Sequence, residues 1–207
     1  MADIFDEIDE DLKRDRAQEL WTKYGKYVIS AAVAVVLGVG ASQGFNAWTR
    51  GQAETSADLY HQALAADDAL AQLQADAGSM TDGYALLARF RIAAAHAAAG
   101  DLTAAESTYA ALAADQAVPQ LYQQAAQLLA VMNAPRSRDV AALQDSLSGL
   151  VEGGPWQPLA LELSAALDLQ AGDKAAAIFK LETLINLAET PNDLRQRASR
   201  LVQVLGS

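Results

Sequence analysis

Two histidines, His61 and His96, are the side chains of this sequence most suited to metal binding or acid–base chemistry near neutral pH. They fall on different predicted helices, and neither has a second ligand four residues away, the spacing at which one helix face can hold a metal ion. The sequence has no cysteine, which excludes thiolate catalysis, disulfides and zinc–thiolate sites. We therefore predict no metal or cofactor, and we expect both histidines to lie on helix surfaces or to pack.

The other reactive side chains show no catalytic arrangement. Serines have no base nearby in the sequence, and Gly38-Val39-Gly40 resembles a dinucleotide-binding motif only faintly, because it follows no strand. Active sites assemble in space, so a missing motif does not exclude an enzyme, but there is no positive sign of one. We expect a protein that is not an enzyme and has no small-molecule substrate. Acidic residues are spread through the predicted helices as solvated positions usually are, among them Glu106, Glu162, Asp168 and Glu182.

The longest apolar stretch covers residues 28–48 and contains no charged residue. A helix of about 20 residues spans roughly 30 Å, the thickness of the hydrocarbon core of a bilayer, and it satisfies its own backbone hydrogen bonds there. We predict a transmembrane helix at 28–48 after an acidic leader at 1–27. A cleaved secretory signal is the alternative, but the leader is long and acidic and the apolar stretch is long enough to span.

Charge predicts the orientation and limits the partners. Five basic residues precede the apolar stretch and only Arg50 follows it before Arg89, so the positive-inside rule places the N-terminus in the cytoplasm and the larger part outside. Residues 51–207 carry eighteen acidic and nine basic side chains. Such an acidic domain argues against nucleic-acid binding, which requires positive charge, and against lying flat on anionic lipid.

The part after the apolar stretch is predicted to be all helical and repetitive. Alanine and leucine, both strong helix formers, dominate it, and no segment alternates with a period of two. Gly100-Asp101 and Gly172-Asp173 lie 72 residues apart, with the break at Ala134-Pro135 between them. A period near 34–36 with two helices per unit is typical of tetratricopeptide-type repeats, in which glycine ends the first helix and aspartate caps the second.

The repeats are predicted to differ in quality. Ala105, Ala141 and Ala177 are expected at the same phase, where a small residue lets two helices pack closely. The middle repeat lacks the turn glycine and has Asp145 where the repeat family places an aromatic residue. An irregular alanine-rich bundle is the alternative. The matches to the repeat pattern are best in the first repeat, at Ala93, Gly100, Leu102, Ala105, Tyr109 and Leu112.

Two further helices are predicted to flank the repeats. A long linking or capping helix is expected within residues 49–79, over 51–77, because apolar residues recur there at alternating spacings of four and three. The repeat domain then covers 80–207. A helix over 192–205, after Pro191, is the expected polar cap of the solenoid.

The order of these parts resembles the YfgM-like family of ancillary subunits of the SecYEG translocon. The resemblance rests on acidic residues beside Ile4, Phe5, Ile8 and Leu12, on Trp21-x-Lys23-Tyr24-Gly25 at the membrane edge, and on the single anchor before degenerate repeats. It implies a bacterial inner-membrane protein with a periplasmic repeat domain. It also implies that the domain works beside the translocon and a membrane-bound periplasmic chaperone and assists exported chains. The same domain family includes periplasmic coordinators of cell division, so an envelope-organising scaffold that binds one folded partner is the alternative function.

Two surfaces are candidate binding sites. Gly40 and Gly44 form a small-residue strip on the anchor that could pair two copies of the chain or dock on a translocon helix, although glycine is also common in membrane helices. A solenoid presents an inner surface made by the first helix of each pair, which we expect to bind extended client segments or the helix of a fixed partner. The residues expected there, unless they are buried between repeats, are Leu87, Phe90, Gln123, Leu159 and Glu162.

Overall fold

The computed structural model describes residues 3–206, with the side chains of residues 14, 18–27 and 29–206, and these residues contain helices and no strand. They divide into two compact units, residues 1–55 and 56–207, and the first helix runs from one into the other. The elements in chain order are α1 (Asp3–Ala65), α2 (Ala69–Asp76), the 3-10 turn η1 (Ala77–Ser79), α3 (Asp82–Ala98), α4 (Leu102–Ala114), α5 (Gln120–Met132), α6 (Val140–Val151), α7 (Gln157–Ala171), α8 (Lys174–Asn186) and α9 (Asn192–Gly206).

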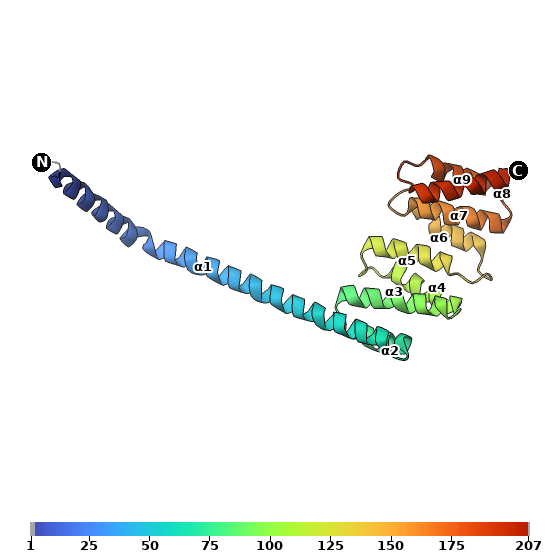
Figure 1. The fold of residues 1–207 in the computed structure, drawn as a ribbon, viewed down its shortest axis with the longest axis horizontal. Coiled ribbons are helices and arrows are strands. Elements are labelled where there is room, and N and C mark those ends of the chain that lie inside the picture. The colour runs from blue at the N-terminus through green and yellow to red at the C-terminus, as the bar shows by residue number, and fades with distance from the viewer. Residues whose placement is uncertain (1–2, 207) are drawn as a thin grey trace. The chain divides into compact units, whose positions relative to one another are not determined.

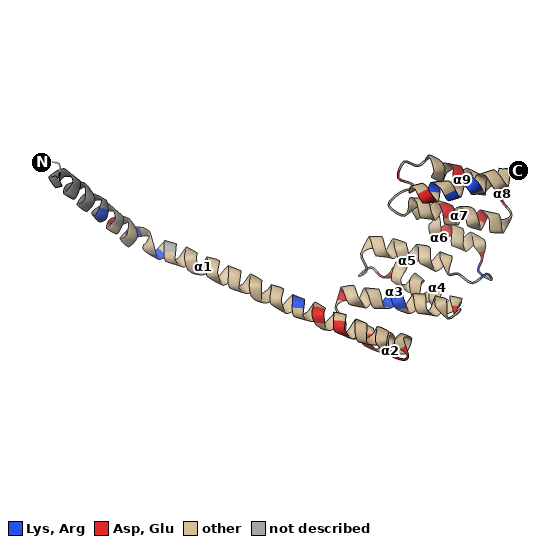
Figure 2. Cartoon of the chain, in the orientation of Figure 1, with Lys and Arg blue, Asp and Glu red and all other residues tan. Residues whose placement is uncertain are grey.

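The first unit consists of the greater part of α1. Figure 2 shows a long stretch of this helix without a charged residue, between Lys26 and Arg50. Large apolar side chains such as Val36 and Leu37 are about two-thirds exposed there, at 70% and 67%. By length and composition, the part of α1 from Gln18 to Ala65 is able to cross a membrane.

The single helix predicted over 51–77 is wrong, because the chain breaks into α1 and α2 at residues 66–68. Asp68 caps α2, and its carboxylate accepts a hydrogen bond from the backbone N–H of Ala71 at 3.0 Å. Aspartate bonds the backbone more readily at a cap than inside a helix, so consecutive aspartates at 67 and 68 favour a helix start over a helix interior. Both segments pack on α3 through a buried cluster of Ala63, Leu73, Met80, Ala88 and Ile92.

The first and third helix pairs, α3–α4 and α7–α8, confirm the predicted turn chemistry. Gly100 and Gly172 have φ angles of 81° and 85°, a left-handed conformation that costs glycine little. Asp101 and Asp173 then cap the second helices, and their carboxylates accept hydrogen bonds from backbone N–H groups at 3.0 and 2.9 Å.

The middle pair, α5–α6, follows a different spacing. Its cap is Asp139, which is 38 residues after Asp101 and 34 before Asp173. Equivalent buried residues of the second helices are separated by the same 38 and 34 residues as the caps. One such set is Tyr109, Leu147 and Leu181, and another is Leu112, Leu150 and Leu184. The predicted equivalence of Ala141 with Ala105 and Ala177 is therefore wrong. Ala141 is exposed, because the longer turn before α6 shifts that helix by two residues and brings Leu143 to the corresponding position.

The core of the second unit is a series of clusters between successive helices. One lies among α3, α4 and α5, the next among α5, α6 and α7, and the last among α7, α8 and α9. Figure 1 shows α3 to α9 as successive layers. Cores shared only between neighbours are the mark of a repeat architecture rather than of an irregular bundle. The predicted terminal helix is present as α9, which buries Leu194 and Ala198 against this last cluster.

Candidate protein-binding surface

An apolar groove of about 660 Å³ lies among α5, α7 and α9. Its floor includes buried leucines of the core, and its rim carries large apolar side chains that remain open to solvent. Met132 is 66% exposed, Leu159 43% and Leu201 38%. Exposed apolar side chains gathered around a hollow, rather than scattered singly, mark a site for another apolar surface. The remaining lining residues are Ala125, Leu128, Leu129, Trp156, Glu162, Leu163, Ala165, Ala166, Leu169, Leu181 and Arg197.

Helix periodicity and the order of packing together produce this groove. On α5, Leu128 and Met132 are four residues apart and so lie on one face, as do Arg197 and Leu201 on α9. α5 and α7 belong to successive pairs, and α6 rather than α5 makes the main contact with α7. The apolar faces of α5 and α7 thus remain partly uncovered where they border the groove.

The groove contains one ion pair. Arg197 of α9 donates two hydrogen bonds to the carboxylate of Glu162 on α7, at 2.5 and 2.7 Å. The hydrogen bond and the charge of Glu162 raise the pKa of the Arg197 guanidinium above its ordinary value, so the guanidinium stays positively charged. Because the remaining lining residues are alanine, leucine, methionine and tryptophan, this pair supplies all the charge of the groove.

A second cavity of about 510 Å³ adjoins the groove and shares Trp156, Leu159 and Arg197 with it. This cavity is more polar, because Glu189 and Asp193 from the segment around the start of α9 contribute to its lining. Both acidic residues are exposed. The apolar groove therefore opens at this side onto two carboxylates.

Trp156 fixes the boundary between the two cavities. It stands at the N-cap of α7, after the Gly153-Gly154-Pro155 loop, and its indole N–H donates a hydrogen bond to the backbone carbonyl of Leu121 at 3.1 Å. Leu121 lies in the first turn of α5. The tryptophan thus ties the start of α7 to the start of α5, at the edge of the groove.

The structure brings together only part of the predicted inner surface. Leu159 and Glu162 line the groove. Leu87 is 51% exposed but lies on α3, outside the groove. Phe90 is not free for binding in the way expected, because it packs on the core among α3, α4 and α5, with its ring centroid 6.1 Å from that of Tyr109.

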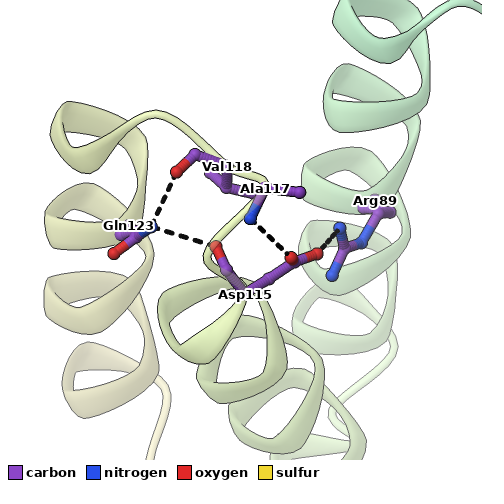
Figure 3. A network of polar contacts seen from close by, with 5 residues as sticks. All are labelled: Arg89, Asp115, Ala117, Val118 and Gln123. Atoms are coloured by element: carbon purple, nitrogen blue, oxygen red, sulfur yellow. Dashed lines mark hydrogen bonds and ion pairs between the residues drawn. The ribbon is translucent and has the colours of Figure 1, made fainter.

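Gln123 is engaged in a polar network rather than in the groove (Figure 3). Its amide donates hydrogen bonds to the backbone carbonyls of Asp115 and Val118, at 3.0 and 2.6 Å. The Asp115 carboxylate accepts hydrogen bonds from Arg89 at 2.6 Å and from the N–H of Ala117 at 3.0 Å, and these contacts lower the pKa of Asp115 below its usual range. The network holds the turn between α4 and α5 against α3.

Sequence reasoning missed the residues that form most of the groove, above all Met132, Trp156 and Leu201. A signal existed for α9, whose apolar residues Leu194, Ala198 and Leu201 recur along one face, but that face was assigned to capping alone. Trp156 in a glycine- and proline-rich loop was a second signal, since tryptophan is enriched at interfaces, where its ring buries apolar area and its N–H finds a hydrogen-bond partner. On α1, a methyl group added at Gly40 or Gly44 would meet nothing within 4 Å apart from its chain neighbours and the nearby backbone of its own helix, so this strip of the helix is open.

Comparison with known protein families gives a match that covers more than half of the chain. A family model described as a tetratricopeptide repeat-like domain matches residues 18–145. This range takes in the apolar stretch of α1, the pair α3–α4 and the greater part of the middle pair, while α7, α8 and α9 lie beyond it. No curated protein and no solved structure matches the chain.

Proposed function

Because the chain belongs to the tetratricopeptide repeat-like domain family, we propose that it is a membrane-anchored scaffold that binds another protein through the groove of α5, α7 and α9. The observation that carries the proposal is the open apolar rim of Met132, Leu159 and Leu201 around an apolar floor. Repeat domains of this architecture expose surfaces suited to protein partners. The proposed role is binding alone, without catalysis.

The anchor gives the binding surface a location. In this proposal the helix at residues 28–48 crosses the bacterial inner membrane, with the leader in the cytoplasm and the repeat domain in the periplasm, as the distribution of basic residues favours. Confinement to the membrane raises the effective concentration of the groove for partners that emerge or reside there. A reporter fused to the C-terminus tests this orientation, and cytoplasmic activity of that reporter would overturn it.

For the partner, we propose an accessory role at the Sec translocon, in which the domain assists exported chains together with a periplasmic chaperone. The support is the resemblance of the leader, anchor and repeats, in that order, to the YfgM-like ancillary subunits. The second candidate is an envelope scaffold for cell division that clamps one folded partner. It is favoured by the same repeat architecture, and it differs in needing a single partner.

Site-specific photo-crosslinking in intact membranes tests the proposal. We would place the crosslinker at Leu159 in the groove and, as the matched control, at Phe179 on α8, which is 71% exposed but does not line the groove. Many exported chains and translocon subunits captured at Leu159 would support the translocon role, and one dominant folded protein would favour the organiser. Equal capture at Leu159 and Phe179 would contradict binding through the groove.

A further inference from the structure

The groove lacks the groups that an extended peptide needs. Backbone N–H and C=O groups that leave water without a new hydrogen bond cost free energy. Among the lining residues the charged groups are Glu162 and Arg197, which already bond each other, and the indole N–H of Trp156 is donated to Leu121. All other lining side chains are alanine, leucine or methionine. A helix forms its backbone hydrogen bonds internally, so it loses no backbone hydrogen bond when it enters such a groove.

Charge around the groove selects one end of that helix. Arg197 forms an ion pair with Glu162 and its charge also interacts with that of Asp193, but no ion pair to Glu189 or Asp193 is found in the described part of the chain. These two exposed carboxylates line the adjoining cavity, which shares Trp156, Leu159 and Arg197 with the groove. The two cavities are thus lined by three carboxylates, Glu162, Glu189 and Asp193, and one guanidinium, so a segment that fills the groove and extends past Trp156 meets a net negative charge.

Resting on the proposed protein-binding function, we infer that the occupant is an amphipathic helix of a partner protein. Its apolar face fills the groove of α5, α7 and α9, and the end that passes Trp156 carries lysine or arginine facing Glu189 and Asp193. The apolar face provides the affinity, and the basic end fixes the direction in which the helix lies.

The test uses the full-length chain in detergent micelles. The sequence has three tryptophans, so Trp21→Phe with Trp48→Phe leaves Trp156, at the groove edge, as the single fluorescent reporter. Three synthetic peptides are titrated: a leucine- and alanine-rich amphipathic helix ending in two lysines, the same helix ending in two glutamates, and the lysine form with a proline at its centre. We expect the lysine form to bind about tenfold or more tightly than either of the others, a difference of about 1.4 kcal/mol.

Variants of the chain separate the two parts of the inference. Leu159→Asp should weaken binding of the lysine peptide by about tenfold or more. Phe179→Asp also replaces an apolar side chain with an acidic one, but outside the groove, and should leave this binding unchanged. Glu189→Gln with Asp193→Asn should remove the preference for lysine over glutamate. Glu182→Gln with Asp145→Asn, which neutralises two exposed carboxylates outside both cavities, should keep it.

Two results would overturn the inference. Equal affinity of the lysine and glutamate peptides would exclude the basic end, and equal affinity of the proline-containing peptide would exclude the helix. If Leu159 still captures proteins in membranes while the peptides show no such preferences, this inference fails and the proposed function stands. If both Leu159 capture and peptide binding are absent, both fail.

Discussion

The outer helix pairs and the middle pair solve the same packing problem differently. In α3–α4 and α7–α8, a glycine turn joins two closely packed helices, and each of these helices buries a small residue, Ala93, Ala105, Ala165 and Ala177 in chain order. In α5–α6 the turn is longer and has no glycine, and the two helices contact each other far less. A groove of about 470 Å³ remains among α4, α5 and α6.

Within the second unit, this difference distinguishes two blocks of closely packed helices, α3–α5 and α6–α9, which share the buried cluster among α5, α6 and α7. α5 makes its main contacts with α4, and α6 makes its main contacts with α7. Gln144 of α6 donates a hydrogen bond to the buried carboxylate of Asp168 on α7 at 2.5 Å, and Lys180 of α8 lies 2.7 Å from the other oxygen. Across the middle pair itself, the Gln127 side chain donates a hydrogen bond to the Ser146 carbonyl. A repeat array can thus be joined by packing between pairs where packing within a pair is weak.

The groove of α5, α7 and α9 crosses the boundary between these blocks, because α5 belongs to one and α7 and α9 to the other. Because α5 lines one side of the groove and α7 and α9 the other, the position of α5 relative to α7 sets the width of the groove. The closely packed pairs α3–α4 and α7–α8 are called closed below, and the loosely packed pair α5–α6 is called open. Substitutions can test whether the two kinds of pair differ in packing.

The largest effect is expected from removing a core side chain of a closed pair. Leu181→Ala on α8, where the leucine is 1% exposed, should lower the free energy of unfolding by about 2–5 kcal/mol, since it removes apolar contacts and leaves a cavity. Urea unfolding followed by Trp156 fluorescence, in the background without Trp21 and Trp48, measures this. Phe179→Ala on the same helix should change it by less than about 0.5 kcal/mol. A similar loss for both would show that α8 is not packed as described.

Overpacking separates the closed and open pairs directly. Ala177→Leu places a large side chain at the α7–α8 crossing and should cost about 1–3 kcal/mol, because the helices there have no room to accept it. Ala142→Leu on α6 points into the groove of the open pair and should cost less than about 0.5 kcal/mol. The same unfolding measurement compares them. An equal cost at both positions would contradict the open middle pair.

The sequence was sufficient for features that depend on local chemistry. The Gly100-Asp101 and Gly172-Asp173 turns were predicted because a left-handed glycine followed by a capping aspartate has a direct signature. The middle repeat was misaligned because the period was assumed constant. The cap Asp139, which marks the true start of α6, was overlooked in favour of an evenly spaced alanine.

The groove was only partly predictable, because it depends on long-range packing. Leu159 and Glu162, two of the residues expected on the binding surface, do line the groove. Phe90 and Gln123 do not, because Phe90 packs on the core among α3, α4 and α5 next to Tyr109, and the Gln123 amide is bound by two carbonyls of the turn before its own helix. The break at Asp67 and Asp68 was missed because the apolar spacing continues through it, so periodicity outweighed the capping signal.

Glycine substitutions should have opposite signs in the two kinds of pair. Gly172→Ala forces a left-handed conformation on an L-residue and should destabilise the closed pair by about 1–2 kcal/mol. Gly149→Ala lies within α6, where an added methyl group meets no atom within 4 Å, and it should stabilise by about 0.5–1 kcal/mol. Thermal unfolding by circular dichroism reports both shifts. Stabilisation by both substitutions would mean that the turn after α7 does not need a left-handed residue.

The smallest expected effect concerns the polar network that holds the α4–α5 turn against α3 (Figure 3). Arg89 and the N–H of Ala117 lower the pKa of the Asp115 carboxyl in the folded chain, so the ionised form stabilises the fold at pH values above the ordinary aspartate pKa of about 3.9. That contribution is lost as the pH falls below this value through the lower folded pKa. Asp115→Asn should therefore be less stable than the parent chain near pH 7, and the difference should shrink steadily between about pH 5 and about pH 3. Urea unfolding of both proteins across this range measures it. A difference independent of pH would assign the role of Asp115 to its hydrogen bonds alone, and the turn between α4 and α5 would then be held against α3 without help from the charge of Asp115.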